Sequence, residues 1–273
     1  MSNEEKFNRL RQLIKGLGPS TVAFSGGVDS SLVAAAACEA LRKKSLAVTV
    51  VSELCPDGEA DEAAATARVI GIRHIAIKMG LLDWDAVASN PPDRCYHCKL
   101  EVFAAVKGVA AREGTGVILD GTNADDAVSH RPGLKALEEL RVISPLARLG
   151  ITKAEVREIA RAVGLPNFDR PSAPCLATRF PYGVRLTRED IERVRYAEEF
   201  IRSLGFRTLR VRDHGGLARV EVEQEMLPRL ASKRTREKIV AKLLSLGYNY
   251  VTLDMEGFRS GSMDIRVKAD EAE

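Results

Sequence analysis

The sequence predicts an α/β protein, in which helices cover both faces of a parallel sheet, followed by a smaller α+β domain. Short apolar segments alternate with helical segments through the first part of the chain, which is the pattern of βαβ units. A stretch with four prolines then interrupts this alternation at residues 165–185. Helices and strands follow in a different order beyond it. We therefore expect two domains, residues 1–180 and residues 181–273.

The elements of the first domain follow from hydrophobic periodicity. Residues 3–17 carry apolar side chains at helical spacing, and Gly18-Pro19 ends that helix. Ligands of such a sheet bind at the carboxyl ends of its strands, near the point where the strand order reverses. Strands are expected at residues 21–24, 46–51, 73–78 and 116–120, and further helices at 31–43, 59–70, 100–113 and 152–163.

The second domain is expected to be compact. Thr187 precedes a helical segment and Asp190 follows it in the first turn, which is an N-cap signal. Two helices over a small antiparallel or mixed sheet would form the domain. Its helices are expected at residues 186–204 and 227–246, and its strands at 208–213, 218–223 and 248–255.

Composition excludes several classes of protein. Hydrophobic residues make up 45% of the 273 residues and charged residues 29%, as in ordinary globular proteins. The balance of 41 basic and 38 acidic residues argues against a salt-driven nucleic-acid binder. No apolar run approaches the ~20 residues that span a bilayer, and the first residues lack the apolar core of a secretory signal. We therefore expect a cytoplasmic protein without a membrane partner.

A glycine-rich loop, S-G-G-V-D-S-S at residues 25–31, lies between the first strand and the next helix. Glycines let the backbone approach an anion closely, and a helix start presents N–H groups with a positive dipole end. The pattern is neither G-x-x-x-x-G-K-[ST] nor G-x-G-x-x-G. We therefore expect an anion-binding loop that belongs to neither of those nucleotide-binding folds.

Five cysteines in a reducing compartment indicate core residues, metal ligands or reactive thiols rather than disulfides. Cys95 and Cys98 form a C-x-x-C pair, and Cys175 follows within the proline-rich stretch. Three thiolates would leave one iron of a [4Fe–4S] cluster open to an additional sulfide. Zinc held by these cysteines and His97 is one alternative, and a metal-free Cys175 nucleophile is another. The remaining cysteines, Cys38 and Cys55, are expected to be structural.

Five segments carry a resemblance that covers nearly the whole chain. They are SGGVDSS, DRCYHCK, GTNADD, PSAPCLATRFPYG and LRVRDHGGLARVEV. In this combination the sequence resembles the LarE-type sulfurtransferases, which belong to the PP-loop ATP pyrophosphatases. Those enzymes convert pyridinium-3,5-biscarboxylic acid mononucleotide to its thiocarboxylate forms, the precursor of the nickel-pincer cofactor of lactate racemase. The resemblance implies the PP-loop fold (adenine nucleotide alpha hydrolase-like) and an ATP-dependent transferase that forms AMP and pyrophosphate.

The resemblance also implies roles for individual residues. Cys175 would handle the sulfur. Because Cys95 and Cys98 are present, the sequence matches the branch with a [4Fe–4S] cluster rather than the branch in which the cysteine donates its own sulfur. Mg²⁺ would bind near Asp125 and Asp126. The ATP-binding residues would be Ser25, Gly26, Gly27, Asp29, Ser30, Ser31, Gly121, Asp125 and Lys153.

The substrate implied by the resemblance carries a phosphate and two carboxylates, so it needs cationic partners. Arg210 and Arg212 alternate along an expected strand and therefore share one face, and Arg179 lies four residues beyond Cys175. We assign these three arginines to the substrate. Glu198 and Glu221 resemble acidic positions of the family and are candidate ligands of a second divalent cation.

Other functions are also compatible with the sequence. Several PP-loop enzymes that thiolate tRNA also pair a C-x-x-C with a distal cysteine, although the near-neutral charge argues against a nucleic-acid partner. A binding module without catalysis and an amide-forming PP-loop enzyme are further alternatives. A small-molecule substrate and a homo-oligomer are expected. The sulfide donor and the role of Trp84 do not follow from the sequence.

Overall fold

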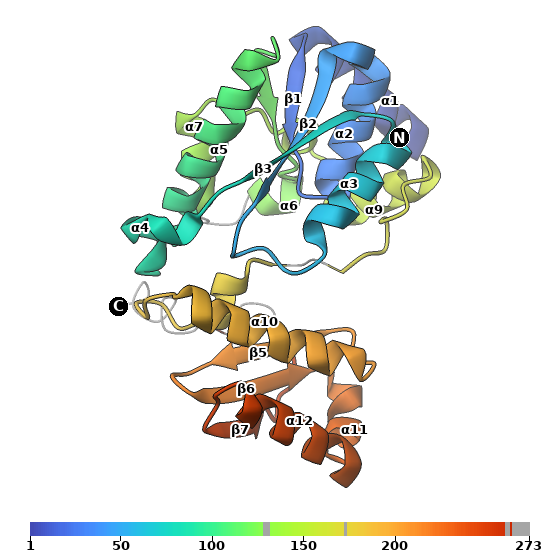
Figure 1. Ribbon diagram of the computed structural model, residues 1–273. Coiled ribbons are helices and arrows are strands. Elements are labelled where there is room, and N and C mark those ends of the chain that lie inside the picture. The colour runs from blue at the N-terminus through green and yellow to red at the C-terminus, as the bar shows by residue number, and fades with distance from the viewer. Residues whose placement is uncertain (128–131, 172–173, 260–262, 264–273) are drawn as a thin grey trace, which may run out of the picture. The chain divides into compact units, whose positions relative to one another are not determined.

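The computed structural model describes residues 1–127, 132–171, 174–259 and residue 263 (Figure 1). The chain divides into two compact units, and short segments of its first half belong to the second unit. The domain boundary expected at residue 180 therefore remains a prediction. Unit 1 comprises Met1–Ser52, Asp57–Gly80 and Asp93–Ala173, and unit 2 comprises Glu53–Pro56, Leu81–Pro92 and Pro174–Glu273.

Unit 1 contains a parallel four-stranded sheet in the order β3-β2-β1-β4. The chain moves outward from β1 to β3 and then returns to place β4 on the other side of β1. The strand order therefore reverses between β1 and β4, where a ligand site is expected. All four strands were predicted to within a few residues: β1 Ser20–Ala23, β2 Ser45–Val51, β3 Arg73–Lys78 and β4 Val117–Leu119.

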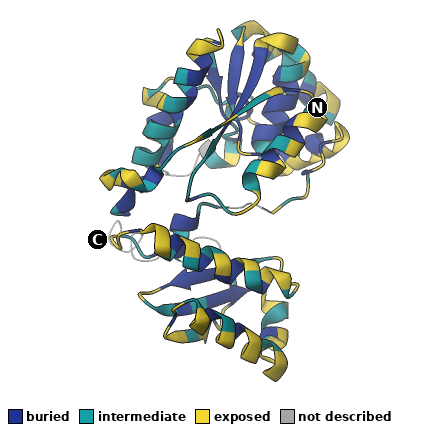
Figure 2. Ribbon diagram, viewed as in Figure 1, coloured by how far each residue is buried: buried dark blue, intermediate teal, exposed yellow. Residues whose placement is uncertain are grey.

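Helices cover both faces of this sheet, as the sequence predicted. Val22 and Leu119 belong to the core on one face, whereas Leu46 and Ile118 belong to the core on the other. Figure 2 shows that β1 and β2 are mostly buried between helices whose outer faces are exposed, whereas the edge strand β3 is partly exposed. The first face packs against α1 Asn3–Leu17, α2 Val28–Leu41, α3 Glu59–Ile70 and α9 Lys153–Ala162, and the second against α5 Arg94–Arg112 and α7 Pro132–Glu139.

Two details of the helices bear on the site. Thr152 and Glu155 form a capping box at the start of α9, as their spacing predicts. Helix α5 starts at Arg94, whereas its apolar pattern predicted a start at Leu100. Arg94 is buried although it is charged, so tertiary packing extends the helix through the C-x-x-C pair. The shorter helices are α4 Asp85–Ala88, α6 Ala124–Ala127 and α8 Pro145–Arg148.

Unit 2 contains a mixed three-stranded sheet, in which β6 pairs antiparallel with β5 and parallel with β7. Thr187 accepts a hydrogen bond from the Asp190 N–H and caps α10, as predicted. The helix predicted at 227–246 is interrupted at Ser232, whose hydroxyl bonds to Thr235 and to the Arg229 carbonyl. The elements are α10 Arg188–Ser203, β5 Leu209–Asp213, β6 Leu217–Val222, α11 Leu227–Ala231, α12 Lys233–Ser245 and β7 Tyr250–Leu253.

One face of this sheet is apolar and the other is charged. Leu209 and Val211 of β5 pack into a core with Ile201 of α10 and Leu243 of α12. The alternate positions of β5 and β6 carry arginine and glutamate side chains instead. No helix in the described residues of either unit is long and apolar enough to cross a membrane.

Candidate active site

The loop at residues 25–31 connects β1 to α2 and has a glycine-dependent shape. Gly26 adopts φ +75°, and an added Cβ would lie 2.9 Å from the Ala63 Cα of α3. Gly27 is the N-cap of α2 and makes no side-chain cap. The Ser30 hydroxyl donates to the Gly27 carbonyl at 3.0 Å. The start of α2 therefore presents its first backbone N–H groups in a tight turn. The glycines of this turn let the backbone approach a ligand closely.

The segment after β4 lies directly against this loop. An added Cβ on Gly121 would lie 2.7 Å from the Ser30 backbone nitrogen. No side chain fits between two backbones at that separation. The segments that follow β1 and β4 thus meet at Ser30 and Gly121, at the point where the strand order reverses.

The acidic side chains beyond Gly121 are arranged around one amide. Asn123 Nδ2 donates to Asp29 Oδ1 at 3.1 Å and to Asp126 Oδ2 at 2.8 Å. Asp125 accepts instead from the Lys153 N–H at 2.7 Å, and the Lys153 ammonium pairs with Asp29. Asp29 and Asp126 therefore share Asn123 as a hydrogen-bond partner, whereas Asp125 bonds to the first N–H of α9.

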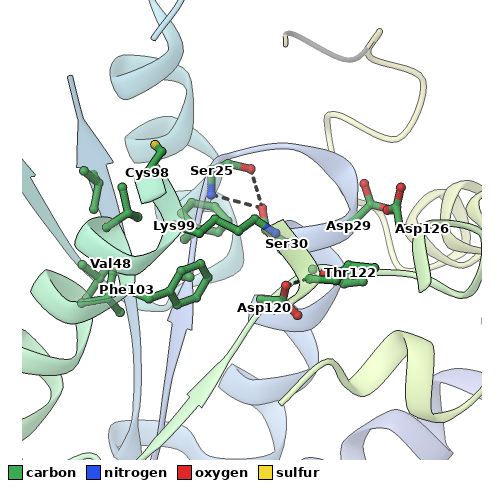
Figure 3. Close-up of a pocket in the computed structure, with 17 residues that line it drawn as sticks. Ser25, Asp29, Ser30, Val48, Cys98, Lys99, Phe103, Asp120, Thr122 and Asp126 are labelled. Atoms are coloured by element: carbon green, nitrogen blue, oxygen red, sulfur yellow. Dashed lines mark hydrogen bonds between the residues drawn. The ribbon is translucent and has the colours of Figure 1, made fainter. Parts of the chain in front are cut away.

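A cavity of 420 Å³ opens on one side of the loop (Figure 3). Its apolar wall is built by side chains of β2 and α5, among them Val48 and Phe103. Lys99 extends from α5 into the same cavity. Its polar edge is formed by Ser25, Asp29, Ser30, Asp120, Gly121, Thr122 and Asp126. An apolar wall beside hydroxyls, carboxylates and an ammonium suits a planar base joined to phosphates.

A second cavity of 190 Å³ lies at the start of α2. Ser25 and Asp29 line both cavities. Two cations, Lys153 and Arg170, line this second cavity together with the Glu59 carboxylate. Two cations beside a helix N-terminus favour a polyanion there.

Ser31 lies outside both groups of lining residues. Its side chain is fully buried, and its hydroxyl accepts a hydrogen bond from Asn167 Nδ2 at 2.9 Å. The same Asn167 amide donates to the Gly26 carbonyl at 2.7 Å. In this structure Ser31 therefore ties the segment around residue 167 to the loop.

The predicted thiols occupy two units. Cys95 and Cys98 lie in the first turns of α5, three residues apart and so on one helix face. Cys98 lines the 420 Å³ cavity, as Figure 3 shows, and Cys95 is exposed. Cys175 belongs to unit 2, where it precedes the 3₁₀ helix Leu176–Arg179. Within the described ranges, no three His, Cys, Asp or Glu side chains form a group that could hold a metal ion.

The arginines assigned to the substrate pair with the glutamates assigned to a cation. Arg179 donates from Nε and Nη2 to the two carboxylate oxygens of Glu198, at 2.8 and 3.0 Å. Arg212 donates to Glu221 at 2.8 Å. Strand register places Arg210, Arg212 and Glu221 on one face of the sheet, because Arg210 lies opposite Glu221 across the β5–β6 ladder. Glu198 of α10 accepts instead from the Val211 N–H of β5 at 3.0 Å.

Arg210 differs from its two neighbours. Its guanidinium lies 5.0 Å from the ring centre of Phe258 and donates to the Leu209 carbonyl. No ion pair to Arg210 is found among the described residues. Burial, and then the positive charge of Arg179, lower the pKa of Arg210 to about 10. An anion placed beside Arg210 would relieve both effects.

Comparison with known proteins identifies the family. The family model described as asparagine synthase matches residues 10–131. The pyridinium-3,5-bisthiocarboxylic acid mononucleotide synthase of Lactiplantibacillus plantarum is 38% identical over 92% of this chain and 91% of its own length. The chain belongs to the LarE-type family of that synthase. An uncharacterised protein of Synechocystis sp. is 39% identical over 96% of this chain and 97% of its own length.

More distant relatives share a shorter region. The glutamine-hydrolysing GMP synthase of Pyrobaculum aerophilum is 32% identical over 70% of this chain and 41% of its own length. The match of a PP-loop family model agrees with the parallel sheet and the loop after β1. Membership in the LarE-type family thus confirms the fold that the sequence motifs implied.

The structure adds residues that sequence reasoning missed. The 420 Å³ cavity is lined by Lys99 and Asp120, and two of its carboxylates accept hydrogen bonds from Asn123. The 190 Å³ cavity is lined by Arg170. Lys99 directly follows the C-x-x-C pair, and Asp120 and Asn123 stand inside the G-T-N-A-D-D region, so position in a motif was the available signal. Nothing in the local sequence marked Arg170.

Proposed function

We propose that this protein is an ATP-dependent sulfurtransferase that converts carboxylates of pyridinium-3,5-biscarboxylic acid mononucleotide to thiocarboxylates. The product would be the precursor of the nickel-pincer cofactor of a lactate racemase or a related enzyme. One observation carries the proposal: Cys98 lines the same cavity as Ser25 and Ser30 of the glycine-rich loop. A sulfur ligand and a phosphate-binding loop therefore face one space. The similarity to the named synthase supports the same activity.

The two cavities divide ATP between them in this proposal. The adenine would lie against the apolar wall of Val48 and Phe103. The β- and γ-phosphates would lie at the start of α2 beside Lys153. Mg²⁺ prefers oxygen ligands, and Asp29 and Asp126 supply them at the edge between base and phosphates. Asp120 supports the presence of a cation here, because its buried Oδ1 accepts no hydrogen bond within the described part of the chain.

The reaction needs ATP because a carboxylate resists nucleophiles. Its negative charge repels them, and oxide is a poor leaving group. Transfer of AMP to the carboxylate creates an acyl adenylate, whose AMP is a good leaving group when a sulfur nucleophile attacks the carbonyl carbon. The N–H groups of the loop and the Lys153 ammonium stabilise the pyrophosphate as its negative charge develops. Lys99 would place a second ammonium on the side of the acyl group.

The sulfur is assigned to the three cysteines. A [4Fe–4S] cluster bound by Cys95, Cys98 and Cys175 would supply sulfide to the adenylated carboxylate. The spacing of Cys95 and Cys98 on one face of α5 fits two ligands of such a cluster. With the cluster as the sulfur carrier, the protein would complete many reaction cycles, whereas sacrifice of the Cys175 sulfur would limit it to one.

The substrate is assigned to the charged face of unit 2. Arg210 is the strongest candidate for its phosphate, because its buried guanidinium has no carboxylate partner among the described residues and gains most from an anion. Arg179 and Arg212 would contribute after exchanging Glu198 or Glu221 for the substrate. The cation role of the two glutamates would require that same exchange. We also propose that the protein acts in the cytoplasm as a homo-oligomer.

Anaerobic purification with iron and sulfide analysis tests the sulfur source. We expect iron in the wild-type protein and its loss in Cys95→Ala, Cys98→Ala and Cys175→Ala. Cys38→Ala, on a helix in the core of unit 1, is the matched control and should keep its iron. An iron-free wild type whose Cys175 loses one sulfur during turnover would show the sacrificial reaction instead. Absence of pyrophosphate release from ATP in the presence of the dicarboxylate substrate would contradict the proposed activity itself.

A further inference from the structure

The 190 Å³ cavity is lined by one cationic side chain, Arg170, to which the family motifs assign no role. Lys153 is one of the ATP-binding residues that the resemblance implies, whereas Arg170 belongs to the proline-rich stretch. Gly27 and Val28 at the start of α2 also line this cavity. Arg170 therefore lines the same cavity as the start of α2 and Lys153.

The present partner of Arg170 is a replaceable one. Its guanidinium pairs with the Glu62 carboxylate in the first turn of α3, and the two side chains are 30% and 49% exposed. Ion pairs with this much exposure contribute only about 0–1 kcal/mol to stability. A phosphate with two negative charges at the loop would compete effectively with a single, hydrated carboxylate. The ion pair with Glu62 thus holds the Arg170 guanidinium near the cavity but is weak enough for a phosphate to replace it.

The backbone that carries Arg170 is held firmly. Asn167 is buried and donates to Gly26 and Ser31 of the loop, as described above. The Arg170 N–H donates to the Asn167 carbonyl at 3.2 Å, which closes a turn. One end of this turn is thus anchored on the loop backbone, and the other presents a guanidinium at the cavity beside the same loop. This arrangement positions a long side chain with little loss of entropy on binding.

We propose that Arg170 binds the terminal phosphates of ATP, exchanging Glu62 for phosphate, and then holds the departing pyrophosphate together with Lys153. A guanidinium binds two phosphate oxygens in a fixed geometry, whereas an ammonium acts as a point charge. Arg170 would therefore orient the diphosphate and Lys153 would neutralise it. This inference rests on the proposed function only in taking ATP as the nucleotide.

Binding of ATP, AMP and inorganic pyrophosphate in the presence of Mg²⁺ tests the proposal by calorimetry. Arg170→Ala should weaken ATP and pyrophosphate about 10- to 100-fold, since it removes a charged hydrogen-bonding group. AMP has no terminal phosphates, so its affinity should change less than about twofold. Arg170→Lys should restore part of the pyrophosphate affinity. Glu62→Gln should strengthen pyrophosphate binding, because it removes the competitor for the guanidinium.

A purely structural ion pair predicts a different pattern. Arg170→Ala and Glu62→Gln would then both lower the midpoint of thermal unfolding, and neither would change the ratio of ATP to AMP affinity. That result would overturn the assignment. Arg161→Ala is the matched control. Arg161 of α9 lies 5.9 Å from the ring of Phe168, which is two residues before Arg170, but Arg161 does not line the cavity. Its ATP affinity should equal that of the wild type.

The experiment also separates this inference from the proposed function. A wild-type protein that binds neither ATP nor pyrophosphate would contradict both. A wild type that binds ATP and releases pyrophosphate, with Arg170→Ala behaving identically, would overturn only the role of Arg170.

Discussion

The loop of unit 1 and the ion pairs of unit 2 both bring acidic and basic side chains together, but they bury these side chains to very different depths. Lys153 and Asp29 beside the loop are 35% and 20% exposed. Arg179 and Glu198 are 2% and 4% exposed, and Arg212 and Glu221 are 5% and 0% exposed. Water therefore reaches the charges of the first region and is excluded from those of the second.

This difference separates charges that exchange partners at little cost from charges that can do so only when a ligand supplies the compensating charge. An exposed pair loses little when one member turns to a ligand, because water replaces the lost partner. A buried pair leaves an uncompensated charge in a medium of low dielectric constant. The loop region is thus suited to repeated binding and release. The buried pairs of unit 2 keep a fixed arrangement until a bound ligand supplies the charge that replaces a lost partner, as the proposed binding of substrate by Arg179 and Arg212 requires.

The largest expected effect breaks a buried pair. Glu198→Gln leaves the Arg179 guanidinium buried beside a neutral amide, so unit 2 should lose about 3–5 kcal/mol of stability. Urea unfolding followed by circular dichroism measures the loss. Lys153→Met in the exposed pair is the comparison and should change stability by less than about 1 kcal/mol. Equal effects of the two substitutions would contradict the distinction between the regions.

A smaller effect is expected where the two strand ends meet in unit 1. Gly121→Ala places a methyl group against the Ser30 backbone nitrogen, within 2.7 Å. The segment after β4 must then move away from the loop, at a cost of about 1–3 kcal/mol. ATP affinity should fall as well. Gly116→Ala is the control because its added Cβ meets nothing within 4 Å, and unchanged ATP binding in Gly121→Ala would refute the close approach.

The smallest effect concerns the cap of α9, the helix that begins at Lys153. The Lys6 ammonium, together with the Thr152 N–H, lowers the pKa of Glu155 from 4.5 to about 2. Because the folded-state pKa is depressed, this stabilisation is complete above pH 4.5 and is lost as the pH falls towards 2. Glu155→Gln should cost about 0.5–1 kcal/mol at neutral pH after solvent screening.

Unfolding curves at several pH values check this assignment. The stabilities of the wild-type protein and of Glu155→Gln should converge as the pH falls from about 4.5 towards 2, because the carboxylate becomes protonated. A difference that is independent of pH would exclude the Glu155 charge as its cause.

Much of the architecture could be predicted from local sequence. The capping box of Thr152 and Glu155 requires only residues three positions apart, and the strands of the sheet are short apolar runs between turn residues. Gly26 and Gly27 likewise indicated the loop from local sequence alone, because adjacent glycines between a strand and a helix permit a tight turn. The start of α5 at Arg94 and the break at Ser232 were missed, because tertiary contacts and a local hydroxyl overrode the apolar pattern.

By itself, the sequence determined the alternation of strands and helices, the loop that approaches an anion and the thiols available for sulfur chemistry. These depend on neighbours in the chain, whose spacing the backbone geometry converts directly into position. Only the tertiary structure decided that Arg179 would pair with Glu198 rather than stand open, that Lys99 and Cys98 would enter the cavity of the loop, and that Arg170 would line the cavity at the start of α2. Such pairings join residues from distant segments, and the free energy of burying their charges depends on how the whole unit packs.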